Sequence, residues 1–361
     1  MKKNIFRRLQ TGGNPLIDGR QVTFYWEGEK APRLIDELHG WEDGAVALKR
    51  VPAKLVPRAE RPLWSVSFEL PRDAYLEYAF YDPDTDQRLS DPFNARSVDN
   101  GLGGWNNFFY MPRGGPTPLT ERRDGIKHGA VTRHMVETAF LVDEGLREVH
   151  LYKPPSRRRV PLLVVYDGTD YLERGRLAHI VDNLIAEKRI RPIAMAMLQN
   201  GGPYRSLEYA CSDATINWLD RVILPLASEH LNLVDIKRSP GAYGVLGASF
   251  GGLMSMYTGL RMPEIFGKVL CQSSVFGLDG RDFAAVDLIR HRQGSDQLKI
   301  WMEVGKLDVD RQEPLLDDNR RMRPILKEKG YRVSYREFNG GHNFTVWRDE
   351  VWRGLEALFP G

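Results

Sequence analysis

Residues 244–252 read GVLGASFGG and place Ser249 at the centre of a G-x-S-x-G pentapeptide, Gly247 to Gly251. A short apolar run, Ala242 to Leu246, precedes the pentapeptide, and a stretch with apolar residues at helical spacing follows it. A strand-to-helix turn this sharp admits only small residues two positions before and after the serine, and it raises the hydroxyl above the end of a sheet. The stretch therefore predicts a nucleophilic serine at the edge of an α/β sheet.

The glycines of this stretch also have a purely structural explanation. Gly247, Gly251 and Gly252 would let a strand and a helix pack closely without any chemistry at Ser249. A dinucleotide-binding turn fits less well, because the glycines follow the order G-x-x-G-x-x-x-G rather than G-x-G-x-x-G. The strand before the pentapeptide and the helix after it favour the nucleophile hypothesis.

Strand and helix patterns alternate from about residue 130 to residue 361. Continuous apolar runs such as 161–166 and 299–304 predict buried strands, and segments with helical periodicity follow several of these runs. A helix over 315–329 and a strand over 331–338 are expected near the end of the chain. Such alternation indicates an α/β fold with a mostly parallel sheet covered by helices on both faces.

The first 111 residues show a different pattern. Apolar and polar side chains alternate over 64–70 and again over 75–81, with a turn signal between the two segments. Short strands at this spacing predict an all-β sandwich. Residues 112–129 are rich in proline, glycine and charge, which is typical of a linker. We therefore expect a β-sandwich domain over 1–111, a linker over 112–129 and an α/β catalytic domain over 130–361.

A nucleophilic serine needs a base within hydrogen-bond reach and a group that orients the base. In the α/β folds that carry this serine motif, the chain order is serine, acid, histidine. Of the two histidines that follow Ser249, His291 lies in a polar segment, whereas His342 follows a predicted strand and precedes the final predicted helix. His342 is therefore the predicted base, although a turn or helix-start residue would fit the same place.

The orienting acid should follow the strand predicted over 299–304. Asp308 is the candidate, because it comes a few residues after the glycine that ends this strand. Asp310 and Glu313 are close rivals, and carboxylates here could instead cap the helix that begins near Pro314.

Acyl transfer also needs donors that face the developing oxyanion. One donor is expected from the backbone amide of Phe250, the residue after the nucleophile. The second is expected from the loop Asp167-Gly168-Thr169, in which Gly168 would let the backbone approach a substrate closely. An ordinary turn explains that loop equally well.

Composition narrows the class of protein. The 361 residues carry 51 basic and 48 acidic side chains, a net charge of +3 that is too small to indicate nucleic-acid binding. Cys271, one of 2 cysteines, lies in an apolar run, so we expect a buried thiol rather than a disulfide. The start of the chain has no apolar run typical of a secretory signal, and no window is apolar enough to span a membrane. Together with the missing metal and phosphate-loop motifs, these features predict a cytoplasmic protein without metal or cofactor.

In the second half of the chain, several segments stand in a fixed order: Tyr166-Asp167-Gly168, Arg205-Ser206-Leu207-Glu208, Gly244 to Gly252, Gly305 to Asp308 with Asn319-Arg320-Arg321, and Gly340-Gly341-His342 ending near Trp347-Arg348. Together they resemble the enterochelin (ferric enterobactin) esterases and their esterase D relatives within the α/β-hydrolases. In the first half, Gly40-Trp41, the strand at Trp64, Tyr78 to Phe80, Asp91-Pro92-Phe93-Asn94 and Met111-Pro112 look like the immunoglobulin-like domain that precedes the hydrolase in such esterases.

The resemblance implies hydrolysis of a carboxylic ester through an acyl-enzyme. Ser249 would be the nucleophile, His342 the acid and base, and a carboxylate such as Asp308 would stand behind the histidine. Arg205 and Glu208 would border the substrate pocket, unless they form an exposed ion pair. The substrate implied is a small molecule, a ferric catecholate siderophore or a related aryl ester, although relatives also cleave feruloyl, acetyl and other esters. A homo-oligomer is compatible with the resemblance.

A different class of function is also open for the first domain. It is similar to glycogen-binding modules, so its tryptophans could stack on sugar, and the chain could then be a carbohydrate-binding or scaffold protein without activity. At strand spacing such residues are more often core, which is the interpretation we favour for Trp26, Trp41, Trp64 and Trp105. We also expect this domain to form a wall of the pocket through its loop Gly101 to Asn107.

Overall fold

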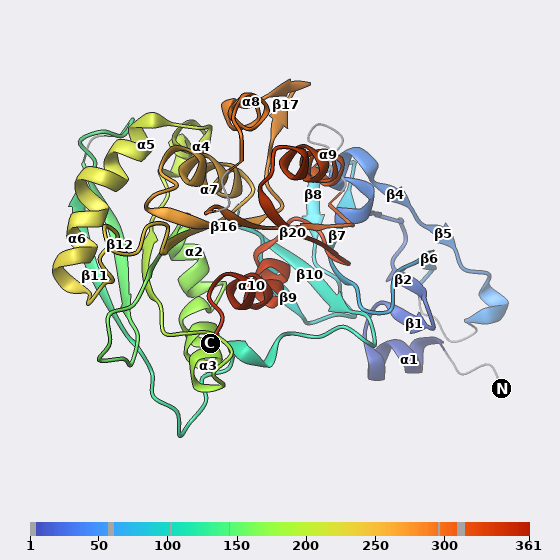
Figure 1. The fold of residues 1–361 in the computed structure, drawn as a ribbon. Helices are drawn as coiled ribbons and strands as arrows, with labels where there is room; N and C mark the ends of the chain where they lie inside the picture. Colours follow the sequence, from blue (N-terminus) through green and yellow to red (C-terminus); the bar gives the residue numbers. More distant parts are fainter. Residues whose placement is uncertain (1–4, 57–60, 102, 144, 295–296, 309–314) are drawn as a thin grey trace. The chain divides into compact units, whose positions relative to one another are not determined.

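The computed structural model describes residues 5–56, 61–101, 103–143, 145–294, 297–308 and 315–361 (Figure 1). Contacts between residues divide the chain into two units. Unit 1 contains residues 1–115, 305–311 and 338–343, and unit 2 contains residues 116–304, 312–337 and 344–361. Two short segments from the far end of the chain thus make their contacts mainly with its first third. The domain boundaries expected at 111 and 129 stay a prediction.

The centre of unit 2 is one mixed sheet in the order β11-β12-β14-β13-β15-β16-β19-β20. The pairs β11–β12 and β12–β14 are antiparallel, whereas β14–β13, β13–β15, β15–β16 and β16–β19 are parallel. This is the α/β arrangement that the strand-helix alternation predicts. The strands are β11 (Ala130–Glu137), β12 (Leu146–Lys153), β13 (Leu162–Val165), β14 (Ala194–Leu198), β15 (Tyr243–Ala248), β16 (Phe266–Gln272), β19 (Lys299–Gly305) and β20 (Arg332–Phe338).

Helices cover both faces of this sheet (Figure 1). Three helices that contact one another lie on one face: α2 (Gly168–Glu173), α3 (Leu177–Ala186) and α10 (Phe344–Leu358). The other face carries α4 (Arg205–Tyr209), α7 (Phe250–Arg261), α8 (Ala284–His291) and α9 (Leu315–Glu328). A continuous helical segment is formed by α5 (Asp213–Trp218), a π-helical stretch (Leu219–Ile223) and α6 (Leu224–His230).

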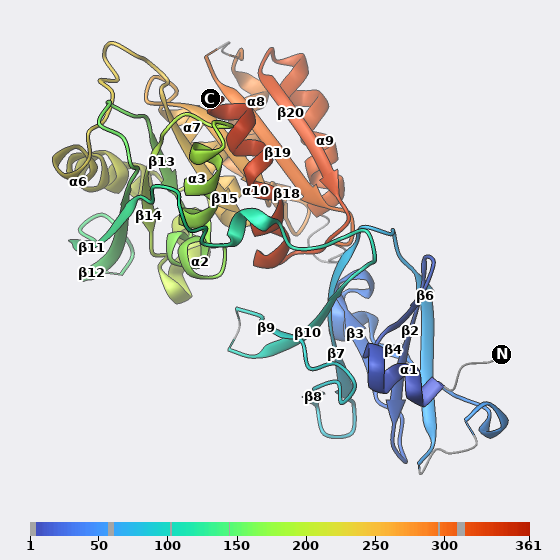
Figure 2. The same ribbon diagram turned by 90° about the horizontal axis from the view of Figure 1, so that it is seen from below.

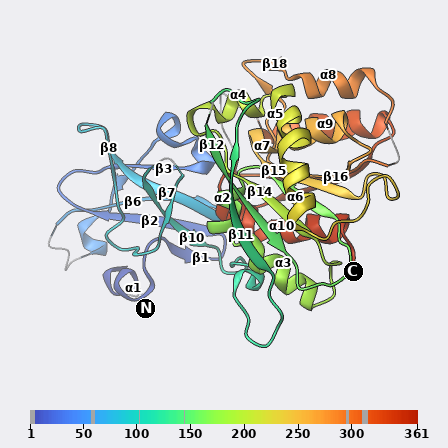
Figure 3. The ribbon, with the colours of Figure 1, turned by 90° about the vertical axis from the view of Figure 1, so that its left-hand side faces the viewer.

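The antiparallel pair β11–β12 forms an edge of the sheet and faces the viewer in Figure 3. The sequence did not single out these two strands or α8. Most side chains of β11 are exposed, so the strand lacks the buried alternation that marks a half-buried strand. None of the helices in the ranges given above is both long and apolar enough to cross a lipid bilayer.

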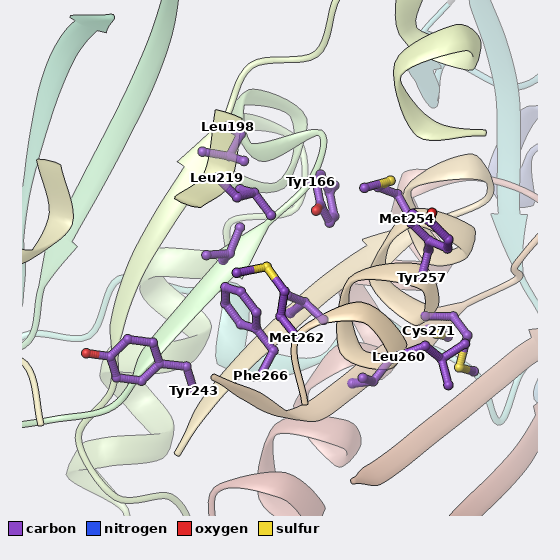
Figure 4. Close-up of a cluster of buried hydrophobic side chains, with 14 of the residues drawn as sticks. Tyr166, Leu198, Leu219, Tyr243, Met254, Tyr257, Leu260, Met262, Phe266 and Cys271 are labelled. Carbon is purple, nitrogen blue, oxygen red and sulfur yellow. The ribbon is translucent and has the colours of Figure 1, made fainter. Parts of the chain in front are cut away.

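A large apolar core lies between the sheet and the helices of unit 2 (Figure 4). It includes Tyr166 after β13, Met254 on α7 and Phe266 on β16, all fully buried. Cys271 is also fully buried in β16, as expected for a thiol that packs as a small hydrophobe. Helix α7 approaches the sheet so closely that a Cβ at Gly259 would lie 2.3 Å from Cγ2 of Val269.

Unit 1 contains two sheets whose described pairs are antiparallel (Figure 2). One has the order β1-β2-β6-β5, and the other has the order β4-β3-β7-β10-β9 with β8 paired to β7. Both contribute to one apolar core that includes Phe24, Leu34, Leu76 and Phe80. An immunoglobulin-like identity for this part stays a prediction. The elements are α1 (Ile5–Gly12), β1 (Leu16–Asp18), β2 (Gln21–Glu27), β3 (Arg33–Asp36), β4 (Val46–Ala47), β5 (Lys49–Arg50), β6 (Leu63–Glu69), β7 (Tyr75–Asp82), β8 (Gln87–Leu89), β9 (Ser97–Asp99) and β10 (Trp105–Tyr110).

The four tryptophans of unit 1 differ in burial. Trp26, Trp41 and Trp64 are half-buried, and the Trp26 ring packs against Phe80 at 4.9 Å between centroids. Trp105 is 66% exposed, so the expectation that it belongs to the core is wrong. It is the first residue of β10, a place where a side chain can leave the sheet's buried face.

One carboxyl group is buried in the sheet of unit 2. Glu303, near the end of β19, is fully buried and accepts hydrogen bonds from Trp301 Nε1 at 2.8 Å and Gln272 Nε2 at 2.5 Å. Burial, with the nearby Glu350 carboxylate, raises the pKa of Glu303 to about 7. Glu303 therefore exchanges its proton in the neutral range rather than near pH 4.

Replacing Gly259 by alanine should test the close approach of α7 to β16. Alanine favours a helix over glycine, but its methyl group would overlap the buried Val269, so we expect a net destabilisation of about 1–2 kcal/mol. Urea unfolding measures the change. Gly115→Ala is the matched control, because a Cβ there meets no atom within 4 Å. Equal stability of the two variants would contradict the packing described for α7.

The raised pKa of Glu303 predicts how stability depends on pH. The folded chain holds this proton more tightly than the unfolded chain, in which glutamate has a pKa of about 4.3. Stability should therefore fall as pH rises from about 4.5 to about 7, by an amount on the order of 3 kcal/mol, and change no further above that. Urea unfolding at pH 5 and pH 8 should show a loss in the wild type that exceeds the loss in Glu303→Gln by about this amount, because other buried acids contribute equally to both proteins. The same pH dependence in both proteins would rule the assignment out.

Candidate active site

Ser249 occupies the turn between β15 and α7 with φ 58° and ψ −126°, a backbone conformation that favours glycine. A Cβ at Gly247 would lie 2.3 Å from the carbonyl carbon of Gly251, so the turn admits no larger residue there. The Ser249 amide donates to the carbonyl of Gln272 on β16 at 2.9 Å. The pentapeptide thus folds into the sharp strand-turn-helix that its glycines predict.

Arg205 and Asp167 lie beside this turn in unit 2. Arg205 Nε and Nη2 donate to the two carboxylate oxygens of Asp167 at 2.6 and 2.7 Å, and Nη2 also lies 3.4 Å from the carbonyl oxygen of Ala248, the residue before the serine. Asn200 Nδ2 donates to the same carboxylate at 2.9 Å. Asp167 is buried, whereas the side chain of Arg205 is 28% exposed. A partly exposed cation is therefore tied to the strand end that carries Ser249.

The two predicted oxyanion donors sit at the beginnings of helices. Phe250 is the first residue of α7, and Gly168 is the first residue of α2. A Cβ at Gly168 would lie 2.1 Å from the amide nitrogen of Leu198, so close packing against β14 already requires glycine at this position. The role of both amides as oxyanion donors stays a prediction.

Glu208 is paired with a residue that the sequence did not single out. Arg147 on β12 donates to both of its carboxylate oxygens, at 2.6 and 2.9 Å, and both side chains are buried. The carboxylate also fills the space beside Gly201, where a Cβ would lie 2.5 Å from Glu208 Oε2. Glu208 thus belongs to a buried ion pair with Arg147, and its predicted role in substrate binding stays a prediction.

In unit 1 the structure brings His342 and Asp308 together. His342 Nδ1 lies 2.8 Å from Asp308 Oδ2. Asp308 is buried, and the His342 side chain is 32% exposed. The two loops are joined by a backbone hydrogen bond from Leu307 N to Gly340 O at 3.0 Å. The rival acids Asp310 and Glu313 lie outside the described residues, and a meeting of His342 with Ser249, which belongs to unit 2, stays a prediction.

The histidine loop is held by residues from the first third of the chain. Glu37 accepts a hydrogen bond from Asn343 Nδ2 at 2.7 Å, and Tyr75 N donates to the carbonyl of Asn339 at 3.0 Å. The sequence analysis missed Glu37. No local signal marks it, because its partners Asn343 and the Glu77 amide lie 306 and 40 residues away in the sequence. Among the residues that the structure describes, no group of three or more histidines, cysteines or acids could hold a metal ion.

Known proteins of similar sequence and structure include esterases. An iron(III) enterobactin esterase of Dickeya dadantii (strain 3937) is 29% identical over 222 residues, which is 57% of this chain and 49% of that protein, so the alignment spans about half the length of this relative. The crystal structure of the enterobactin esterase from Shigella flexneri in the presence of enterobactin matches with a TM-score of 0.75 and 18% identity, covering 95% of this chain and 94% of the other. A ferulic acid esterase from Anaeromyces mucronatus, solved in complex with ferulic acid, has a TM-score of 0.54 at 17% identity, covering 67% of this chain and 94% of the other.

At these identities the two solved structures support the fold alone. The family assignment comes from a family model described as "Esterase: Putative esterase", which matches residues 144–358. This region holds both Ser249 and the His342–Asp308 pair, and it covers more than half of the sequence. The chain therefore belongs to this esterase family.

Proposed function

We propose that the chain is a serine esterase in which Ser249 attacks the ester carbonyl, His342 transfers the proton and Asp308 orients His342. The observation that carries the proposal is the backbone of Ser249, a serine held where a glycine would be relaxed. Such strain is typical of functional residues, because the surrounding structure must maintain it at a cost. Here the packing of Gly247 against Gly251 maintains it.

The hydrogen bond between His342 and Asp308 supports different roles for the two imidazole nitrogens. With Nδ1 of His342 donating to Asp308, Nε2 is the nitrogen that takes the proton from the Ser249 hydroxyl as Oγ bonds to the ester carbon. The Phe250 and Gly168 amides would stabilise the oxyanion. The alcohol then leaves with the proton from Nε2, and water cleaves the acyl-enzyme by the same steps in reverse.

The sheet supports a shared location for these groups. Strands β15 and β19 both run parallel to β16. The carboxyl ends of parallel strands lie at the same edge of a sheet, where α/β enzymes bind their ligands. Ser249 follows β15 directly, and Asp308 follows the end of β19 by three residues.

For the substrate we propose a catecholate siderophore ester or a related aryl ester. Two similar proteins are enterobactin esterases, and the partly exposed side chain of Arg205, paired with Asp167 beside the nucleophile turn, could also contact an anionic group on the substrate. Feruloyl and short acyl esters are the alternative, in keeping with the structural likeness to a ferulic acid esterase.

Activity should depend on Ser249. We expect wild-type protein to hydrolyse p-nitrophenyl butyrate and Ser249→Ala to lose kcat by on the order of 10⁴-fold or more, with a comparable loss in His342→Ala. Ser228→Ala is the control, because Ser228 lies on α6 and donates to the carbonyl of Leu224. Wild type no faster than Ser249→Ala would favour the non-catalytic scaffold.

Comparing kcat/KM for a ferric catecholate trilactone, a feruloyl ester and the butyrate decides among the proposed substrates.

Glycine at position 249 should make the protein more stable while leaving it inactive. At φ 58° and ψ −126° glycine removes the strain, so Ser249→Gly should exceed Ser249→Ala in unfolding free energy by about 1 kcal/mol. Ser228 is the matched control, because it lies inside a helix. There the glycine variant should be less stable than the alanine variant by about 1 kcal/mol, the opposite order to that expected at position 249. Urea unfolding of all four variants measures both differences, and the same order at the two positions would exclude a strained turn.

A further inference from the structure

Glu37 is a buried carboxyl group that the proposed reaction does not yet use. It lies in the short 3-10 helix η1 (Glu37–His39) after β3, is 4% exposed and belongs to unit 1. Asn343 Nδ2 donates to its Oε1 at 2.7 Å, and the backbone amide of Glu77 on β7 donates to its Oε2 at 3.2 Å. One carboxyl group thus joins a strand of the first domain to the residue that follows His342.

The same carboxyl group contacts the residue that precedes His342. A Cβ at Gly341 would lie 2.3 Å from Cδ of Glu37 and 2.5 Å from its Oε1, so the glycine backbone packs directly against the carboxyl plane. Glu37 therefore restrains Gly341 by contact and Asn343 by hydrogen bonding. His342 lies between these two restraints, with its ring held at Nδ1 by Asp308.

The charges around Glu37 favour its neutral form. Glu77 faces it from β7, Asp308 from the loop after β19, and the His342 loop carries the imidazole bound to Asp308. On its own element, Asp36 and His39 are occupied with each other. Burial, followed by the Glu77 carboxylate and with a smaller effect of Asp308, raises the pKa of Glu37 well above its usual value despite the two donated hydrogen bonds.

We propose that Glu37 is a positioning residue for His342, a carboxyl group of the first domain that fixes the loop 341–343 so that the imidazole keeps its alignment. The inference rests on the proposed function, in which His342 transfers the proton. A clamp on both neighbours of the base matters because an error of about 1 Å in such a group can lower the rate on the order of 100-fold. Glu37 does not itself touch the substrate in this scheme.

The Glu37–Asn343 hydrogen bond can be tested by exchanging donor and acceptor. Asn343→Asp removes the amide donor and places a second carboxyl group against Glu37, so the two groups must repel each other or share one proton in place of the amide hydrogen bond. In the double variant Glu37→Gln/Asn343→Asp, the new amide oxygen can accept from the Glu77 amide while the new amide nitrogen donates to the new carboxylate. We expect Asn343→Asp and Glu37→Ala each to lower kcat on p-nitrophenyl butyrate by on the order of 100-fold with little change in KM. The double variant should recover most of the loss caused by Asn343→Asp.

Asp91→Asn is the matched control. Asp91 is also a buried carboxyl group of unit 1 that accepts hydrogen bonds from Asn14, Tyr78 and the Phe93 amide, but it does not contact the histidine loop. It should lose stability in urea while kcat stays near the wild-type value, and circular dichroism confirms that each variant is folded. A double variant no more active than Asn343→Asp, or a Glu37→Ala protein with wild-type kcat, overturns the inference.

Failure of the inference can be told apart from failure of the proposed function. If Ser249→Ala abolishes activity while Glu37→Ala does not lower kcat, the esterase mechanism stands and only the positioning role of Glu37 falls. If Ser249→Ala is as active as the wild type, the proposed function itself is refuted, and the inference falls with it.

Discussion

The contact between the backbones of Gly247 and Gly251 is the constraint on which the proposed chemistry depends. It forces β15 to turn into α7 within one residue, and that residue is Ser249 at φ 58°. A relaxed turn would need either a glycine at 249 or more space between strand and helix. Because α7 also packs closely on β16 through Gly259, an outward shift of the helix that relieved the turn would lose buried contacts with the sheet. The strain at one serine is thus maintained by the packing of a whole helix, which explains why Gly247 and Gly259 leave no space for a larger residue.

The second half of the proposed triad depends on a different part of the chain. Asp308 and His342 stand in loops after β19 and β20, yet the contacts of these loops place them in unit 1 with the first third of the sequence. Leu307 enters the apolar core of unit 1, and Asn339 and Asn343 hydrogen-bond to Tyr75 and Glu37. If Asp308 and His342 act as proposed, unit 1 has a catalytic reason to be present even without binding any ligand. Sugar binding is then not needed to explain why the half-buried tryptophans are present. Trp105 differs, because it is exposed and packing in the core does not explain it.

The sequence allows the prediction of elements whose signal is local. The strand-turn-helix at Ser249 and the pairing of His342 with Asp308 follow from motif, chain order and strand ends, since side chains after parallel strands gather at one edge. The partner of Glu208 could not be predicted, because Arg147 lies 61 residues away in the sequence, on β12. Glu37 was missed for a related reason: its partners, Asn343 and the amide of Glu77, are 306 and 40 residues away. Long-range contacts between polar groups leave no periodic trace in a single sequence.

Two buried carboxyl groups, Glu303 and Glu37, are hydrogen-bonded to residues next to the proposed catalytic groups. Their protonation changes the charge near these groups. In unit 2, Glu303 accepts from the side chain of Gln272, whose backbone carbonyl accepts from the Ser249 amide. In unit 1, Glu37 accepts from Asn343 beside the base. In the proposed mechanism, a full negative charge at Glu303 would oppose an oxyanion formed beside Ser249, and one at Glu37 would add a second negative charge beside the Asp308–His342 pair. Burial raises the pKa of both groups, so each can serve as a hydrogen-bond acceptor while adding less negative charge than an ordinary glutamate. In the proposed mechanism, Asp308 is the carboxylate that stabilises the imidazolium formed during the transfer.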